Sequence, residues 1–260
     1  MPSPLDLLLD PVSLAAMAIY GALIAWEALA PARKLPAVRG WRLMGLAAFI
    51  VYFFVSSYLP LLWTGQLARF QLFDLTGLGT WRGALVGLLV YEFGVYAWHR
   101  TMHNSSVLWR LFHQMHHSAE RVDTFGAFWF SPLDMAGWTL LSSLALTLVV
   151  GITAEATTVV LLATTLLAVF QHANVRTPQW LGYLVQRPES HSHHHERGVH
   201  ARNYSDLPVF DLLLGTFHNP RGFAPAAGFY DGASARIIDM LLTRDVSAPR
   251  LDGASPARAA

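Results

Sequence analysis

Long apolar runs separated by short polar segments fill the first two thirds of the chain. Three of them, 12–30, 43–63 and 82–98, are each long enough to cross a hydrocarbon core of about 30 Å as one helix. A fourth apolar region, 133–170, is interrupted by the polar residues 151–155, so we expect a helical hairpin that crosses twice. The pattern predicts an all-α, multi-pass membrane helical bundle with about five crossings.

The remaining segments are polar. Residues 66–80 are too polar to cross and are expected to lie along the membrane interface. The segment 100–131 and the region after residue 171 are rich in histidine and arginine, and we expect them to form a helical cap. The economical interpretation is a single membrane-embedded domain over 1–245, followed by a disordered tail over 246–260.

The distribution of cations predicts the orientation in the membrane. With five crossings, the loop 31–42, the segment 100–131 and the C-terminal region share one side, and they hold all of the 18 lysine and arginine residues except Arg69 and Arg82. Cytoplasmic loops carry such an excess, so the cap is expected in the cytoplasm and the N-terminus outside. The strong preference for arginine over lysine points to a GC-rich bacterium, and hence to its inner membrane.

Composition supports a membrane protein and excludes several kinds of chemistry. The chain is 53% hydrophobic and 13% charged, whereas soluble domains carry about 25% charged residues. A net charge of +1 gives no support for a nucleic-acid partner. Cysteine is absent, which excludes disulfides, thiolate metal sites, iron–sulfur clusters and a cysteine nucleophile.

Three short histidine clusters carry the candidate chemistry. One reads H-x-x-x-H, and the other two, 113–117 and 191–195, both read H-x-x-H-H. Helix residues three and four apart share a face, so each cluster can aim two or three imidazoles at one point. Neutral imidazole is the commonest metal ligand, and eight rings suit two ions. The eight are His99, His103, His113, His116, His117, His191, His194 and His195.

The other histidines are weighed one at a time. His172 ends the last span at the depth where the first cluster emerges, which favours it as a ninth ligand. His193 falls outside the H-x-x-H-H pattern. His200 follows His195 by five residues, one too many for a zinc-protease box, because that step turns the two rings to different faces. His200 and His218 are interpreted as interfacial or capping residues.

These clusters, in this order and with this hydropathy, resemble the fatty acid hydroxylase and sterol desaturase superfamily of membrane di-iron proteins. The resemblance spans about 91–216 and continues through Asn203-Tyr-Ser-Asp-Leu and Phe210-Asp-Leu-Leu-Leu-Gly-Thr. It implies two iron ions held by the eight histidines, plausibly with His172, at the cytoplasmic face. It also implies that O₂ and electrons are used to oxidise an unactivated C–H bond. Zinc is expected to substitute in purified protein, because imidazole sites accept both metals.

The same resemblance implies a lipid substrate, such as a fatty acyl chain or a sterol, that arrives from the bilayer. We see no dinucleotide fingerprint and no room for a haem or flavin domain, so a separate ferredoxin or cytochrome-type donor is expected to supply electrons. Asn203 and Asp206 are the leading candidates to orient the ligand imidazoles. An equally good interpretation is that they shape a turn before Pro208.

Two alternatives to lipid hydroxylation stay open at this stage. Lipid desaturation begins with the same hydrogen abstraction, and the sequence does not separate the two outcomes. A transition-metal transporter would place ionisable residues in the middle of its spans. The runs 12–30, 43–63 and 133–170 have none there, and Glu92 is the nearest exception.

Overall fold

A computed structural model of the chain describes residues 1–249, and within them the regular secondary structure is helical apart from an isolated bridge between Glu196 and Ala227. Most of the tail expected over 246–260 lies outside the described residues. Val246, where that tail was expected to begin, is fully buried, and its amide donates a 3.3 Å hydrogen bond to Gln114 Oε1. The packed chain therefore continues past residue 245.

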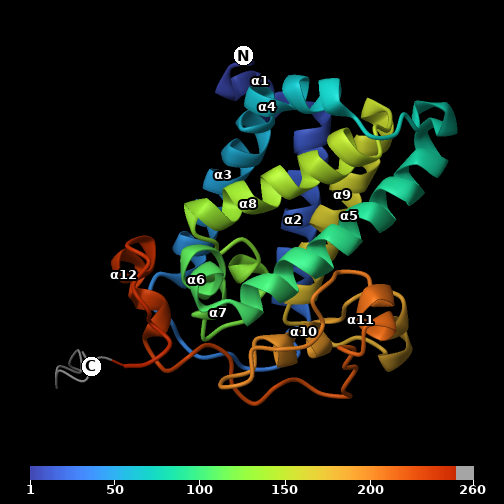
Figure 1. Ribbon diagram of the computed structural model, residues 1–260. Coiled ribbons are helices and arrows are strands. Elements are labelled where there is room, and N and C mark those ends of the chain that lie inside the picture. Colours follow the sequence, from blue (N-terminus) through green and yellow to red (C-terminus); the bar gives the residue numbers. More distant parts are fainter. Residues whose placement is uncertain (250–260) are drawn as a thin grey trace.

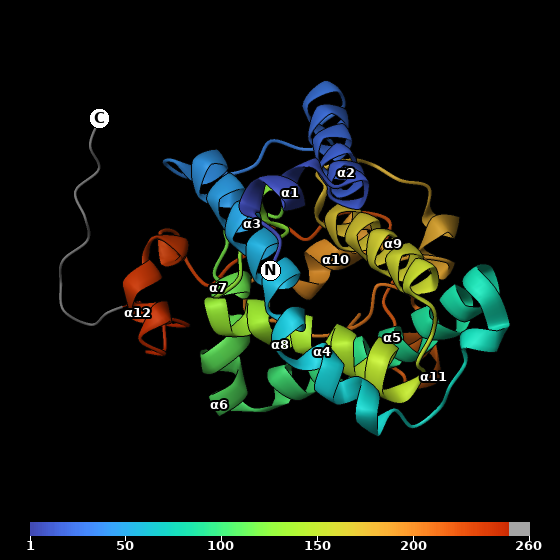
Figure 2. The same cartoon turned by 90° about the horizontal axis from the view of Figure 1, so that it is seen from above.

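Within the described residues, five helices run between the two ends of the molecule (Figure 1). They are α2 (Pro11–Leu29), α3 (Trp41–Tyr58), α5 (Gly79–Asn104), α8 (Pro132–Ser143) and α9 (Ala154–His172). Helix α8 continues directly into the π-helical turn η5 (Leu144–Val149). Seen from above, α3, α4 and α8 lie on one side and α2 and α9 on the other, with α10 visible between them (Figure 2).

Four of the described segments are long and apolar enough to cross a membrane: Pro11–Leu29, Trp41–Phe70, Pro132–Val149 and Ala154–His172. The hairpin predicted over 133–170 is therefore present. The span predicted at 82–98 lies inside α5 but does not qualify, so the candidate spans number four and not five. Its apolar stretch is bounded by charged residues and interrupted by a fully buried Glu92, whose charge lowers the hydropathy of the helix.

One end of the bundle, called the distal end below, carries α1 (Pro4–Leu9), α4 (Pro60–Leu67), η1 (Ala68–Phe70) and η2 (Thr76–Leu78). The Tyr58 hydroxyl donates a hydrogen bond to the Pro2 carbonyl, which ties α3 to the N-terminus. The Leu72 amide donates to the Leu148 carbonyl at 2.7 Å. The polar segment expected along the interface therefore packs against the end of η5.

The opposite end carries the histidine cap. Its short elements are α6 (Ser106–Leu108), η3 (Trp109–His113), α7 (Gln114–His117), η4 (Thr124–Gly126), η6 (Gln179–Tyr183), α10 (Pro188–His194), α11 (Val209–Leu213), η7 (Ala233–Ala235) and α12 (Ile237–Leu241). In Figure 1, α7, α10 and α11 gather around the lower ends of α5 and α9, and α12 lies to the side, beside α6 and α7. The arginine-rich segments of the sequence are thus collected on one side of the bundle.

A few strong contacts fix the cap to the bundle. Glu27 Oε2, near the end of α2, accepts hydrogen bonds from the Thr124 amide, the Thr124 hydroxyl and the Asn174 amide at 2.6–3.0 Å. Gly45 lets α3 approach the cap, because a Cβ there would lie 2.2 Å from the Phe125 carbonyl oxygen. Such overlap would force the backbone apart. The cap therefore sits in one position on the helices.

Candidate metal centre

Nine imidazoles meet where the bundle joins the cap, and eight of them are buried while His103 is partly buried. They come from four places in the chain. Helix α5 and the end of α9 bring three rings from the bundle, and η3, α7 and α10 bring six from the cap, counting His195 at the end of α10. The π-helical turn η3 directly precedes α7, and such turns are frequent at functional sites.

The first group holds five imidazoles, each with one ring nitrogen within 4.8 Å of the others: His99, His103, His113, His117 and His194. The Nε2 atoms of His99 and His113 lie 2.9 Å apart. Those of His103, His117 and His194 are buried and have no hydrogen-bond partner. Buried nitrogens in native proteins are almost always satisfied, so these three Nε2 atoms are suited to bind a metal ion.

The second group holds four imidazoles under the same distance limit: His116, His172, His191 and His195. Their Nε2 atoms form a chain of short contacts. His172 Nε2 lies 3.1 Å from His116 Nε2 and 3.0 Å from His191 Nε2. The Nε2 atoms of His191 and His195 lie 3.1 Å apart. All four rings thus point their Nε2 atoms at one small volume.

The spacing of the nitrogens fits metal coordination. Two nitrogens bound to one ion at about 2.1 Å lie about 3.0 Å apart when their bonds are at right angles. The Nε2 contacts in both groups are 2.9–3.1 Å. Burial lowers the pKa of His113 to about 3, and burial is also the main cause that lowers the pKa of His116 and His195. The rings are therefore neutral at physiological pH, which is the form that binds metal.

The Nδ1 atoms of the first group all have partners within the protein. Such contacts set the tautomer and orient the ring so that Nε2 stays free for a metal. Three of these Nδ1 atoms donate to backbone carbonyls at 2.7–2.9 Å, and one contacts a carboxylate. The partners are the carbonyls of Tyr204 for His99, of His200 for His103 and of Arg202 for His194, Asp134 Oδ2 for His113, and His200 Nδ1 for His117.

The second group is held differently. His172 Nδ1 donates to the Ala168 carbonyl at 2.7 Å, but the Nδ1 atoms of His116, His191 and His195 are buried without a partner. Ring packing orients these side chains instead: His195 stacks on His117 with centroids 4.2 Å apart and planes 18° apart. The two groups therefore differ in ligand number and in how firmly their rings are fixed.

All nine histidines proposed from the sequence lie in these two groups. His193 does not, because its Nδ1 contacts Glu196 and its Nε2 contacts the Gly222 carbonyl. His200 lies just outside the first group and supports two of its rings. His218 packs its ring against His193. The spacing rule therefore selected the same members of the third cluster that the structure brings together.

The two residues proposed to orient the imidazoles make other contacts. The Asn203 side chain bonds both backbone groups of His218, and Asn203 has a φ of 50°, which favours its interpretation as a turn residue. Asp206 Oδ1 accepts from Gln171 Nε2 at 2.7 Å. A carboxylate that does contact one of the nine rings is Asp134, which the sequence analysis missed. Its signal was an acidic residue in the first turn of an apolar span.

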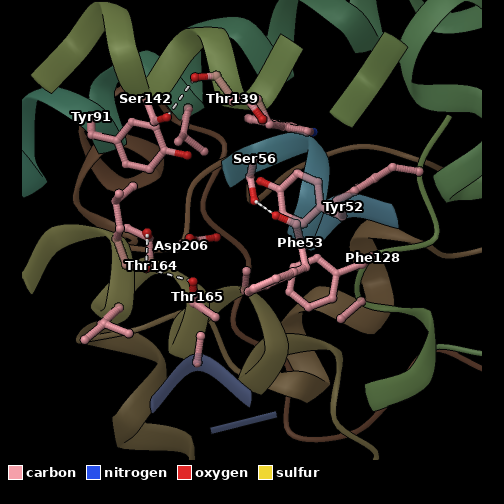
Figure 3. Close-up of a pocket in the computed structure, with 18 of the residues that line it drawn as sticks. Tyr52, Phe53, Ser56, Tyr91, Phe128, Thr139, Ser142, Thr164, Thr165 and Asp206 are labelled. Atoms are coloured by element: carbon pink, nitrogen blue, oxygen red, sulfur yellow. Dashed lines mark hydrogen bonds between the residues drawn. The ribbon is translucent and has the colours of Figure 1, made fainter. Parts of the chain in front are cut away.

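A cavity of about 550 Å³ in the bundle reaches both histidine groups. Rings from each group line it, including His99, His113 and His172, and its walls come from α3, α8 and α9. Figure 3 shows Tyr52 and Phe128 facing the same space as Asp206. Ligand cavities of this kind measure about 300–1,000 Å³, so the space suits one small molecule or one chain of a lipid.

A known family matches the part of the chain that holds all nine histidines. A family model described as fatty acid hydroxylase matches residues 84–216, just over half of the chain. Ornithine lipid hydroxylase OlsE of Rhizobium tropici is 33% identical over 141 residues, which are 52% of this chain and 42% of that protein. The matched region thus spans less than half the length of this curated relative. No solved structure matches the chain significantly.

Proposed function

The chain belongs to the fatty acid hydroxylase family, and on that premise we propose that it is a membrane di-iron monooxygenase that hydroxylates an unactivated C–H bond of a lipid. The observation that carries the proposal is the convergence of nine histidines in two groups beside one cavity. The proposed ligands are His99, His103, His113, His117 and His194 for one ion, and His116, His172, His191 and His195 for the other.

Two iron ions bound there would supply the activation of O₂ and the oxidation of the C–H bond. In the overall reaction a C–H bond is broken and a C–O bond forms, and the second oxygen atom leaves as water. Two electrons from a separate ferredoxin or cytochrome-type donor and two protons balance this. Zinc fits the same imidazole sets and is the expected contaminant of purified protein.

The chain's own residues hold the rings and the substrate. Five protein contacts on Nδ1 atoms fix the first group, so its Nε2 atoms need no rearrangement to bind an ion. The apolar part of the cavity, including Tyr52, Phe128 and Leu146, excludes water and positions the lipid. A fatty acyl chain, a sterol and an ornithine lipid are the candidate substrates. The last is suggested by the relative OlsE.

The proposed location is a bacterial inner membrane, with the histidine cap in the cytoplasm and the N-terminus outside. Four helices that are long and apolar enough to span support membrane insertion. The cation-rich loop 31–42 contacts the cap, because Arg121 Nη1 donates to the Pro36 carbonyl. An excess of cations at one end is typical of the cytoplasmic side.

The experiment is to express the chain together with a reductase system in a bacterial host and to profile the host lipids by mass spectrometry. A gain of one oxygen atom supports hydroxylation, and a loss of two hydrogen atoms indicates desaturation instead. The His116→Ala variant is the matched inactive control, since it removes a ring of the second group. Lipid profiles that do not differ between the wild type and this variant would contradict the proposal.

A further inference from the structure

The cavity extends along α9, from the distal end of the bundle to the histidine groups. It is lined by Thr157 near the start of α9 and by His172 at its end, which are about 22 Å apart at the rise of an α-helix. Lining residues near the distal end, such as Ser57 and Thr157, are partly exposed. Lining residues near the histidines, such as Ala127 and Asp206, are buried. The lining residues Leu161 and Thr165, partway along α9, are also exposed or partly exposed. The cavity is therefore most enclosed beside the histidine groups.

Several serine and threonine hydroxyl groups line this cavity. They include Ser56 and Ser57 on α3, Thr139 and Ser143 on α8, and Thr164 and Thr165 on α9. Each of these six donates its proton to a carbonyl of its own helix, at 2.7–3.1 Å. Since their protons are committed, their oxygens can only accept from a molecule in the cavity. These six oxygens therefore favour a substrate group that donates hydrogen bonds.

The enclosed part of the cavity, beside the histidine groups, holds a carboxylate. Asp206 is 8% exposed and lies on the cavity wall (Figure 3). The cavity lining contains no other acidic residue and, within the described chain, no lysine or arginine. Asp206 Oδ1 accepts from Gln171, and no ion pair found among residues 1–249 includes Asp206.

A second buried acid lies behind Asp206. Glu92 Oε2 accepts from the amides of Asp206 and Leu207, and Glu92 Oε1 is buried without a partner. A buried carboxylate is unfavourable unless a cation or hydrogen-bond donors compensate it. Burial raises the pKa of Asp206 to about 7, so a bound cation would keep this carboxylate ionised at neutral pH. The site is thus complementary to a positive charge.

We propose that the substrate is a lipid that carries a cationic amine and that Asp206 binds this amine beside the histidine groups. The C–H bonds presented to the metals are then those near the amine, while the acyl chains extend along the cavity away from the metal centre. A neutral acyl chain in this place would leave the hydroxyl acceptors and Asp206 unused. The inference rests on the proposed hydroxylation and narrows its substrate class.

The test compares ornithine lipid with the same lipid after acetylation of its amine, using iron-loaded enzyme and a reductase system. In the wild type, tandem mass spectrometry should place the new oxygen on the head group. Asp206→Asn should raise the KM for the amine lipid by about tenfold or more, because a charged hydrogen bond is lost. It should leave the KM for the acetylated lipid unchanged. The control Glu155→Gln changes an exposed carboxylate at the distal end and should alter neither value.

An equal effect of Asp206→Asn on both lipids, or a new oxygen on an acyl chain, would overturn the inference. Iron content and thermal unfolding of the variant show whether it is folded. If it is not, Thr165→Val should still weaken turnover of the amine lipid selectively. Binding of the two lipids to the wild type, measured by native mass spectrometry, separates the proposals. If the wild type binds the amine lipid preferentially but does not turn it over, the proposed hydroxylation is refuted and the amine site is not. If it turns over lipid but shows no preference for the amine lipid, the amine site is refuted and hydroxylation is not.

Discussion

The imidazole of His113 and the carboxylate of Asp134 form a contact of 2.9 Å in which the two side chains are 1% and 0% exposed. His113 Nε2 at the same time lies 2.9 Å from His99 Nε2. One ring thus links an acid on α8 to the first histidine group. A carboxylate in this position orients a ligand imidazole and increases its basicity.

Removing this carboxylate should weaken metal binding at the first group. Asp134→Ala leaves the His113 Nδ1–H without its acceptor, and losses of about 10–100-fold in metal affinity are typical of such changes. Asp134→Asn should recover part of the loss, because an amide oxygen still accepts a hydrogen bond. Iron per chain, measured against increasing chelator, gives the affinity. Asp74→Ala, an exposed acid near η2, is the control, and an Asp134→Ala protein with unchanged affinity would exclude the role.

The third histidine cluster, residues 191–195, permits a test of which of its histidines take part in the site. His116→Ala and His195→Ala each remove a ring from the second group, so we expect turnover to fall below detection and about one iron per chain to be lost. His193→Ala removes only contacts to Glu196 and to the Gly222 carbonyl, so most activity and both irons should remain. Turnover of host lipids and metal analysis provide the readouts. Complete loss of activity in His193→Ala would mean that the H-x-x-H-H pattern selects the wrong histidines of the third cluster.

The choice of histidines that come together was predictable because their spacing is local. Their division between two groups was not, since each H-x-x-H-H cluster was expected to aim its rings at one point. In the structure His113 and His117 lie in the first group and His116 in the second, and His194 is likewise separated from His191 and His195. The helical hairpin was predictable from local sequence, since its apolar runs are continuous. Exclusion of His193 also followed from spacing alone.

The contacts that hold the site were not predictable, because they join distant parts of the chain. Asp134 meets His113 across 21 residues, and Glu27 meets Thr124 across 97. Nothing near either acid in the sequence marks its partner. Helix α5, which holds the span predicted at 82–98, runs between the two ends of the bundle like the helices of the four qualifying segments. Glu92 was visible in the sequence as an exception, but the hydrogen bonds that it accepts from backbone amides of the cap were not.

Glu27 should contribute measurably to stability. In Glu27→Ala the amides of Thr124 and Asn174 lose their acceptor, and each unsatisfied buried donor costs about 1–3 kcal/mol. We expect a lower unfolding temperature for the iron-loaded protein in detergent and a smaller loss in Glu27→Gln. Glu155→Ala, at an exposed acid, should unfold like the wild type. Equal stability of Glu27→Ala and wild type would show that Glu27 does not hold the cap.

The unequal support of the two histidine groups predicts that their metal ions leave at different rates. Every Nδ1 of the first group has a protein partner, whereas three of the four in the second group have none. Rings held only by packing reorient more easily, so a chelator should remove the ion of the second group first and leave a plateau near one iron per chain.

Two variants assign the fast and the slow phase of iron release to the two histidine groups. His116→Ala lacks a ring of the second group and should show the slow phase alone, and His103→Ala, which lacks a ring of the first group, should show mainly the fast phase. The time course of iron release, followed with a coloured chelator, measures both. The wild type could instead release both ions in a single phase, and both variants could release iron with that same rate constant. This result would mean that the Nδ1 contacts do not control how firmly the metals are held.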